Sequence, residues 1–356
     1  MDKYQTFYQP GPEILDLVQR IEQQLSHWSG LVAALSSQQR LVLQHRALQA
    51  SLALDHNSLS VGQVQELAAG KRVVALVQDI QQAHNALTLY QQAGQLNPFK
   101  SADLCQAHAA FMRSFSPDGG QYRQQGAGVY EGHKLVHMPP PPAKVATLVE
   151  ELLHKLQHEQ IHPLLVSCLM HYQLAFIHPF SDGNGRLCRL WQQLVLTQWQ
   201  PGFAYLPFIT QLKDKARDYH KTLRQSVPKY DATAFILFML RSILESLTTE
   251  AEQLEQTSVT LLAQLPDQPL VDLSQFVQLQ QQKTQKVKTR AAGPWYKTED
   301  QILKKLKKDN RLSAKTIADE LGLSSRAIEK QLAKLKAEGK LLRTGPAKGG
   351  RWQVVA

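Results

Sequence analysis

The segment from His178 to Arg189 holds the residues best suited to chemistry. It reads His-Pro-Phe-Ser-Asp-Gly-Asn-Gly-Arg-Leu-Cys-Arg. Pro179 disfavours a helical conformation at the preceding residue, and the two glycines let the backbone approach a ligand closely. A helix that begins near residue 184 presents its first unpaired N–H groups to an anion, at Gly183, Asn184 and Gly185.

The charged residues of the same segment complete a site for a phosphate chain. Arg186 and Arg189 lie three residues apart on one face of the expected helix, where they can contact further phosphate oxygens. Asp182 supplies a hard oxygen ligand of the kind that Mg²⁺ prefers. His178 is the nearby side chain whose ordinary pKa suits proton abstraction near neutral pH. Together these residues predict an enzyme that handles nucleotides.

The segment resembles the signature of the Fic (filamentation-induced-by-cAMP) family, which is His-Pro-Phe-x-Asp/Glu-Gly-Asn-Gly-Arg-x-x-Arg. Every fixed position of that signature is present at 178–189. Two neighbouring features agree with the family pattern. Met138-Pro139-Pro140 follows an expected hairpin, and His171-Tyr172-Gln173 precedes the motif. The resemblance covers roughly residues 40–250.

The resemblance implies a protein adenylyltransferase, which moves AMP from ATP to a protein hydroxyl, releases pyrophosphate and also modifies itself. His178 would take the proton from a Ser, Thr or Tyr of a target protein as its oxygen attacks the α-phosphate. Asp182 would hold Mg²⁺. The amides of 183–185, with Asn184, would form an anion hole. Arg186 and Arg189 would bind the β- and γ-phosphates, and Phe180 would pack into the core.

Other interpretations remain open at this level. The chain could be a DNA-binding regulator whose Fic domain senses a nucleotide, or a relative that keeps the motif without activity. It could also be a Fic enzyme that transfers another group, or one that removes AMP from a target.

The resemblance also suggests residues outside the motif. Many family members place two adjacent tyrosines against the nucleoside, and the match here is Tyr219-His220, with one tyrosine replaced. The expected flap, which positions the target, includes Gly132, Leu135, Val136 and His137. An inhibitory helix with the pattern Ser/Thr-x-x-x-Glu-Gly/Asn has its candidate in Ser51 and Asp55. Asp is one methylene shorter than Glu, so an ordinary helix end at Asp55 is an equal alternative.

The C-terminal part carries the basic character of the chain. Residues 281–356 hold 19 Lys and Arg against 7 Asp and Glu, a balance of +12, which leaves residues 1–280 at −2 of the total of +10. Two helices joined by Gly322-Leu323-Ser324, followed by an expected hairpin, resemble a winged helix domain. Nucleic-acid contacts would come from Ser325, Arg326, Lys330 and Lys334 in the groove, and from Lys348 and Arg351 on the backbone. A protein-docking role is the alternative.

The whole chain of 356 residues favours two or three domains. Its 3 cysteines and the absence of a long apolar run indicate a reduced, cytoplasmic protein away from membranes. A homodimer is a possible oligomeric state. His154, His158 and His162 have a spacing that could ligate a metal on one helical face, although no fourth ligand is evident.

The expected fold is mainly α-helical, a Fic-type helical core with a short β-hairpin flap, plus a small α+β winged helix-turn-helix domain. Apolar periodicity predicts helices over 13–28, 41–54, 72–95, 163–177, 184–199 and 231–254, and a hairpin within 126–138. The expected divisions are an N-terminal helical region over 1–95 with the inhibitory helix near 46–57, a catalytic core over 96–255, a helix end and linker over 256–294, and the winged helix domain over 295–356.

Overall fold

A computed structural model describes residues 8–131, 133–226, 231–263, 298–321, 324–337, 339–344 and 351–354. The chain divides into two compact units, residues 1–264 and 265–356. The prediction of a mainly helical protein with small two-stranded sheets is confirmed. Among the described residues, no helix is both long and apolar enough to span a bilayer.

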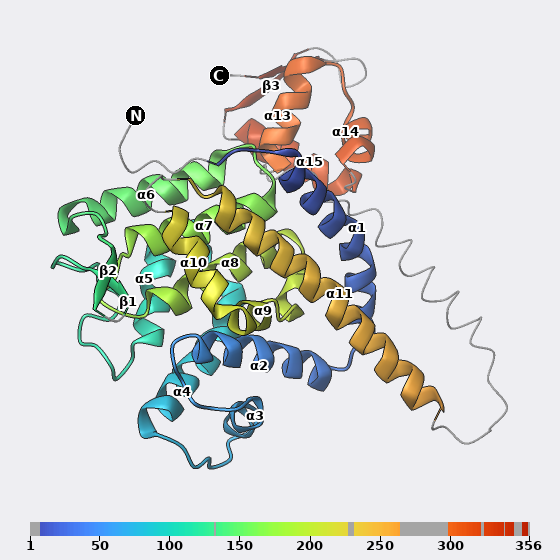
Figure 1. Ribbon diagram of the computed structural model, residues 1–356. Coiled ribbons are helices and arrows are strands. Elements are labelled where there is room, and N and C mark those ends of the chain that lie inside the picture. Colours follow the sequence, from blue (N-terminus) through green and yellow to red (C-terminus); the bar gives the residue numbers. More distant parts are fainter. Residues whose placement is uncertain are drawn as a thin grey trace. The chain divides into compact units, whose positions relative to one another are not determined.

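Two consecutive helices, α7 (Pro163–Ile177) and α8 (Asn184–Trp199), form the centre of the first unit (Figure 1). Residues on every side of α7 are apolar, and nearly all of them are buried. A helix that is apolar all round must be enclosed by other elements, which explains the central position of α7. The loop between these helices carries His178, so the site is built on the most enclosed part of the unit.

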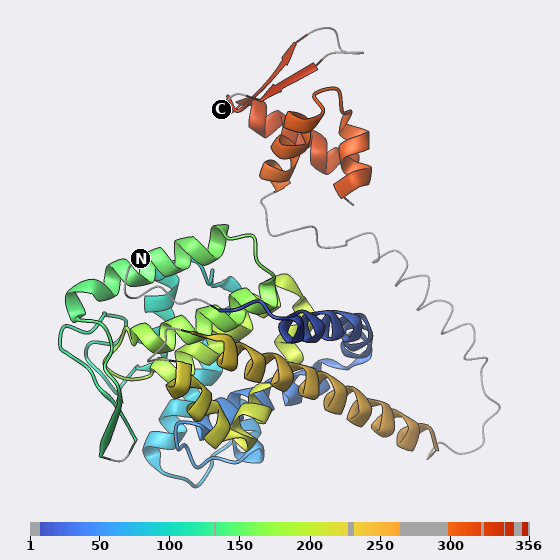
Figure 2. The ribbon, with the colours of Figure 1, turned by 45° about the horizontal axis from the view of Figure 1, so that its top comes forward.

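The N-terminal helices surround this centre. Helix α1 (Pro12–Ala34) buries a stripe that includes Ile14, Ile21 and Trp28, and it packs along α11 (Thr233–Ala263; Figure 2). Capping boxes open α2 (Ser37–Ala53) and α3 (Val61–Ala68), where Ser36 and Ser60 each exchange hydrogen bonds with a glutamine three residues later.

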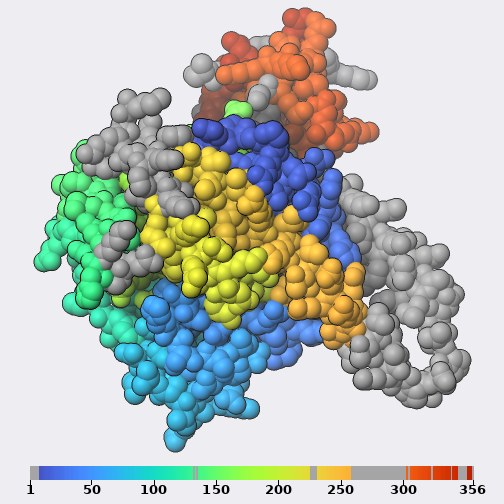
Figure 3. All heavy atoms as spheres, in the orientation of Figure 1, coloured from blue at the N-terminus to red at the C-terminus, as the bar shows by residue number. Residues whose placement is uncertain are grey.

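The remaining elements of the first unit complete the enclosure of α7 and α8. They are α4 (Val77–Gln92), the 3₁₀ turn η1 (Ala93–Gln95), α5 (Ser101–Phe111), strands β1 (Val129–Glu131) and β2 (Lys134–His137), α6 (Pro142–His158), the 3₁₀ turn η2 (Pro201–Tyr205), α9 (Ile209–Asp214) and α10 (Ala216–Ser226). Strands β1 and β2 pair antiparallel as the expected flap hairpin, with Tyr130 opposite Leu135. Helices α1, α10 and α11 occupy the middle of the face of the first unit shown in Figure 3, where α11 contacts both of the others.

Several boundaries differ from expectation. The helix predicted over 13–28 continues to Ala34, and the one predicted over 41–54 begins at Ser37. The helix predicted over 72–95 begins only at Val77, and Val74 and Leu76 before it are largely exposed. The helix predicted over 231–254 continues to Ala263. Helices α5, α9 and α10 were not predicted. Helix α10 has the sequence ARDYHKTLRQS. Most of these residues are polar, so the few apolar residues that pack inward do not form a recognisable periodic pattern.

The second unit contains α13 (Thr298–Lys308), α14 (Ala314–Leu321), α15 (Ser325–Ala337), β3 (Leu341–Thr344) and β4 (Arg351–Val354). Ser313 and Ser324 cap α14 and α15 through their hydroxyl groups. The strands pair antiparallel, and a small core forms around Ile317, Leu332 and Trp352. This is the arrangement of three helices and a hairpin expected of a winged helix domain.

Candidate active site

The loop between α7 and α8 depends on two left-handed residues. His178 ends α7 with φ of 51° and ψ of 63°, and Gly183 precedes α8 with φ of 74°. A Cβ at position 183 would lie 2.9 Å from the Met112 sulfur, so both the backbone angle and the space require glycine. A non-glycine residue such as His178 adopts this conformation only where its surroundings enforce it.

Phe180 and Asn184 fix the middle of this loop. The Phe180 ring is fully buried, as expected, and stacks on the His108 ring with 3.7 Å between centroids. The Asn184 side chain accepts a hydrogen bond from the Phe180 N–H and donates one to the Phe180 carbonyl, at 3.0 and 2.9 Å. Its amide is therefore used within the loop. These bonds use the side-chain oxygen and one of the two side-chain N–H groups, and the part of Asn184 in an anion hole stays a prediction.

His108 on α5 supports the other side of the loop. Its Nδ1 accepts a hydrogen bond from the Gly120 N–H, so its Nε2 must carry the proton that is donated to the Asp182 carbonyl, at 2.9 Å. Burial lowers the pKa of His108, which keeps this ring neutral. This role was not predicted from the sequence, because a histidine on a helix face is most often ordinary packing.

The two motif arginines are deeply buried and meet one carboxylate. Asp55, in the turn after α2, accepts from Arg186 Nε through one oxygen and from Arg189 Nη2 through the other, both at 2.9 Å. The Ser51 hydroxyl and carbonyl accept two further bonds from Arg189, at 2.9 and 2.8 Å. Burial alone would lower the pKa of Arg189, but attraction by Asp55 outweighs it and raises the pKa. The shorter Asp side chain thus reaches both arginines.

Gly185 permits this close approach of α2 to α8. A Cβ there would lie 3.1 Å from Arg189 Nη1 and 3.2 Å from Asp55 Oδ1. Helix α2 is held in place by a second ion pair, in which the buried Glu250 of α11 accepts two hydrogen bonds from the partly exposed Arg46 at 2.7 Å each. The carboxylate of Asp55 therefore occupies the position where two cations converge.

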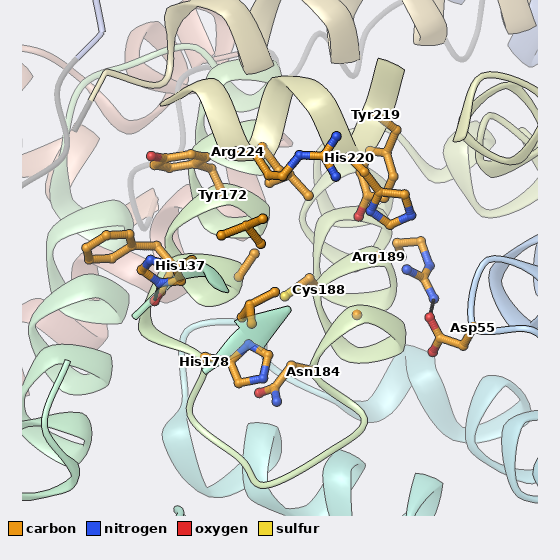
Figure 4. Close-up of a pocket in the computed structure, with 16 residues that line it drawn as sticks. Asp55, His137, Tyr172, His178, Asn184, Cys188, Arg189, Tyr219, His220 and Arg224 are labelled. Atoms are coloured by element: carbon orange, nitrogen blue, oxygen red, sulfur yellow. Dashed lines mark hydrogen bonds and ion pairs between the residues drawn. The ribbon is translucent and has the colours of Figure 1, made fainter. Parts of the chain in front are cut away.

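A cavity of about 180 Å³ lies beside these groups (Figure 4). Its lining combines charged and polar groups, among them Asp55, Arg189, His178 and Asn184, with apolar and aromatic ones. The apolar and aromatic residues include Val129, Val136, Tyr172, Phe176 and Leu223. His220 and Arg224 of α10 also border it. Such a lining suits a ligand that joins an anionic chain to a flat ring.

His178 borders this cavity and is partly buried. Burial, with smaller contributions from His137 and Arg123, lowers the pKa of His178 to about 4. The imidazole is therefore neutral at pH 7 and can accept a proton. The pKa of His178 therefore differs from the ordinary histidine value that was assumed from the sequence, because the ring is enclosed by the protein.

Tyr219 lines the cavity with a ring that is otherwise buried. Its hydroxyl lies 2.9 Å from His171 Nε2, and His171 Nδ1 lies 2.6 Å from Gln192 Oε1. Because a carboxamide oxygen can only accept, His171 must carry its proton on Nδ1 and accept from the Tyr219 hydroxyl. Burial lowers the pKa of His171 to about 3, which agrees with a neutral ring. Tyr219 is thus fixed beside Arg189.

The flap residues divide between the cavity and the surface. Val136 and His137 border the cavity, and His137 Nε2 is 2.7 Å from the Phe176 carbonyl. Leu135 is 41% exposed on the outer side of β2. Gly132 lies outside the described residues.

Asp182 is exposed at the start of α8, and its Oδ1 accepts from the Gly183 N–H at 2.6 Å. The described residues contain no group of three or more His, Cys, Asp or Glu that could hold a metal ion by themselves. A single carboxylate beside an anion site fits Mg²⁺, which is commonly bound by one or two carboxylates and substrate phosphates. The histidine trio does not share one helix, because α6 ends at His158 and His162 caps α7.

The second unit has a basic surface on its third helix. Ser325, Arg326, Lys330 and Lys334 are all exposed on α15, and Arg351 is exposed on β4. Lys348 lies outside the described residues.

Comparisons with known proteins give consistent results for both units. A profile of the Fic/DOC family matches residues 95–196, and one of an HTH domain matches residues 298–350. The curated protein adenylyltransferases Fic of Drosophila grimshawi and Drosophila mojavensis are 34% identical over 122 residues, which is 33% of this chain. The matched part is 23% and 22% of their respective lengths, so the chain corresponds to less than a quarter of these relatives.

Solved structures extend the likeness over the whole chain. The crystal structure of a Fic family protein from Desulfovibrio desulfuricans G20 is 31% identical, with a TM-score of 0.66 over 99% of both chains. A Fic domain containing signaling protein from Bacteroides thetaiotaomicron has a TM-score of 0.56 over 67% of this chain and 98% of its own. At 20% identity, the second likeness concerns the fold alone.

Proposed function

The chain belongs to the Fic family, and on that premise we propose that it transfers AMP from ATP to a Ser, Thr or Tyr hydroxyl of a protein. The observation that carries the proposal is the cavity between α7, α8 and the flap. A neutral imidazole, the first residues of a helix and a buried arginine border it together with apolar and aromatic side chains. The curated relatives named as adenylyltransferases support the same reaction.

In this proposal His178 is the general base. Its neutral ring takes the proton of the target hydroxyl while the hydroxyl oxygen forms a bond to the α-phosphorus. The bond from that phosphorus to the bridging oxygen breaks, and pyrophosphate leaves with the electron pair. The products are an AMP-modified side chain and pyrophosphate.

The N-terminus of α8 and the two arginines bind the phosphate chain. The N–H groups of Asn184 and Gly185 have no partner within the helix, so they would donate to phosphate oxygens. Arg186 and Arg189 neutralise the β- and γ-phosphates, where negative charge grows as pyrophosphate leaves. Asp182 would hold Mg²⁺, which supplies further neutralisation of the phosphates when bound. Tyr219 and the apolar wall would enclose the nucleoside.

The contact of Asp55 with both arginines makes the described state an inhibited one in this proposal. The carboxylate satisfies the cations that the phosphates would otherwise meet. Transfer then requires Asp55 to move away or to be displaced by the nucleotide.

The decisive test is incubation of the protein with Mg²⁺ and ATP labelled at either the α- or the γ-phosphate. AMP transfer attaches the α label to protein and never the γ label, and intact-mass analysis identifies the added group. Attachment of the γ label would replace the proposal by phosphoryl transfer. A parallel reaction with other nucleoside triphosphates tests for another transferred group, and incubation with AMP-modified protein tests for AMP removal.

Binding of duplex DNA by the second unit is a second candidate function. The match to an HTH domain and the exposed cations along α15 favour it. In this proposal Ser325, Arg326, Lys330 and Lys334 enter the major groove, while Lys348 and Arg351 contact phosphates.

A further inference from the structure

Arg123 is a buried arginine outside the motif, with no role predicted from its position in the sequence. It lies in the loop that leads from α5 to the flap, and only 4% of its surface is exposed. Among the described residues it forms no ion pair with a carboxylate. Its guanidinium instead donates to four backbone carbonyls, those of Gln125, Pro140, Ile177 and His178.

These carbonyls explain how a buried charge is tolerated there. Those of Ile177 and His178 lie at the end of α7, where the helix itself provides no donors and its dipole is negative. Arg123 Nε donates to His178 O at 2.8 Å, and Nη2 donates to Ile177 O at 3.3 Å. The guanidinium therefore acts as a cap on the last turn of α7.

The contacts of Arg123 hold the backbone on both sides of the proposed base. The side chain binds the carbonyls of residues 177 and 178, and the Arg123 N–H donates to the Pro179 carbonyl at 3.0 Å. Three successive peptide groups are thereby fixed around His178, whose left-handed φ of 51° is costly for a non-glycine residue. The direction of the imidazole depends on this backbone conformation.

The same side chain also binds the exit of the flap. Arg123 Nη2 donates to the Pro140 carbonyl at 2.5 Å, three residues beyond the end of β2. One rigid, planar group thus spans the segment after the flap and the loop that carries His178. Lysine could not replace it, because a single ammonium group lacks the fork that reaches separated acceptors.

We propose that Arg123 is a positioning residue that locks His178 in its left-handed conformation and sets the spacing between the flap and the proposed base. This inference rests on the proposed function, in which the flap holds the target hydroxyl and His178 takes its proton. A misplacement of about 1 Å at such a site can cost about a hundredfold in rate.

The test is the full-length R123K variant, with R40K as the matched control. Arg40 also caps a helix through backbone carbonyls, donating to Val32 O at 3.1 Å and Ala33 O at 3.0 Å at the end of α1, and it does not border the cavity. We expect R123K to lower kcat for AMP transfer at least about tenfold while KM for ATP stays within about twofold. R40K should leave both constants unchanged. Equal loss in the two variants, or an unchanged kcat in R123K, would overturn the inference.

Hydrogen exchange provides a readout that does not need turnover. In R123K we expect faster exchange of the amides at 178–183 and at 134–140 together, and no such change in R40K. Unchanged exchange, or a change in one segment alone, would refute the coupling of flap and loop. If the wild-type protein transfers no AMP, the proposed function fails, while the exchange comparison still decides whether Arg123 joins the two segments.

Discussion

Replacement of Asp55 by alanine tests the inhibited state most directly. The variant loses two hydrogen bonds between charged groups, one to Arg186 and one to Arg189, each of 2.9 Å. Such a bond contributes about 1.5–3 kcal/mol. Because the Asp55 side chain is still 27% exposed, solvent screens it and the lower end of that range applies. Two bonds then contribute about 3 kcal/mol, which corresponds to a factor on the order of a hundred in affinity.

The expected result is therefore tighter binding of ATP by up to about a hundredfold, with a rise in self-modification. Isothermal titration calorimetry measures the Kd values for ATP and AMP. AMP lacks the phosphates that would displace Asp55, so its affinity should change far less. Without nucleotide the variant should also melt at a lower temperature, because Arg186 and Arg189 remain buried without their partner. ATP should restore much of that loss.

Two further variants control for generic effects. Asp55→Glu keeps the charge and should stay closer to wild type than Asp55→Ala. Glu13→Ala removes a carboxylate that pairs with Arg241 on the surface and should leave ATP affinity unchanged. Equal ATP affinity in the wild type and Asp55→Ala would assign Asp55 to helix packing. A gain that is equally large for AMP would also refute the reasoning.

Three other outcomes are expected. His178→Ala should lower AMP transfer by about a hundredfold or more while the Kd for ATP, measured by calorimetry, changes little; unchanged transfer would remove His178 from the mechanism. Because burial lowers the pKa of His178 to about 4, kcat/KM should fall only as the pH approaches 4, where the imidazole becomes protonated. An acid limb near the ordinary value of 6.5 would contradict this assignment. In fluorescence anisotropy, DNA affinity should fall with salt at a log–log slope of about −0.9 per phosphate neutralised. Arg326→Ala should weaken binding to a preferred sequence more than to random duplex, whereas Lys348→Ala should weaken binding to both alike. Absence of binding at low salt would indicate a protein-docking domain.

Local patterns in the sequence determined most helices and the identity of the motif. Helices α7 and α8 were expected with the bounds that the structure shows, because Pro163 and the glycines of the motif mark where they begin. The motif could be recognised because its residues are contiguous, so their spacing alone places the helix N-terminus, the arginines and His178 together. The flap hairpin was likewise evident from turn residues between short apolar runs.

Tertiary structure decided which partners these residues meet. Whether Asp55 reaches Arg189 depends on how closely α2 approaches α8, and that distance is set by Gly185 and by the packing of α2 against other helices. Asn184 proved to bind its own loop, since backbone groups at Phe180 lie within reach only after the turn has formed. Arg123 contacts residues about 55 positions away, a relation that no local periodicity contains. Burial, which shifts the pKa of His178, is likewise a property of the packed core and cannot be read from neighbouring residues in the sequence.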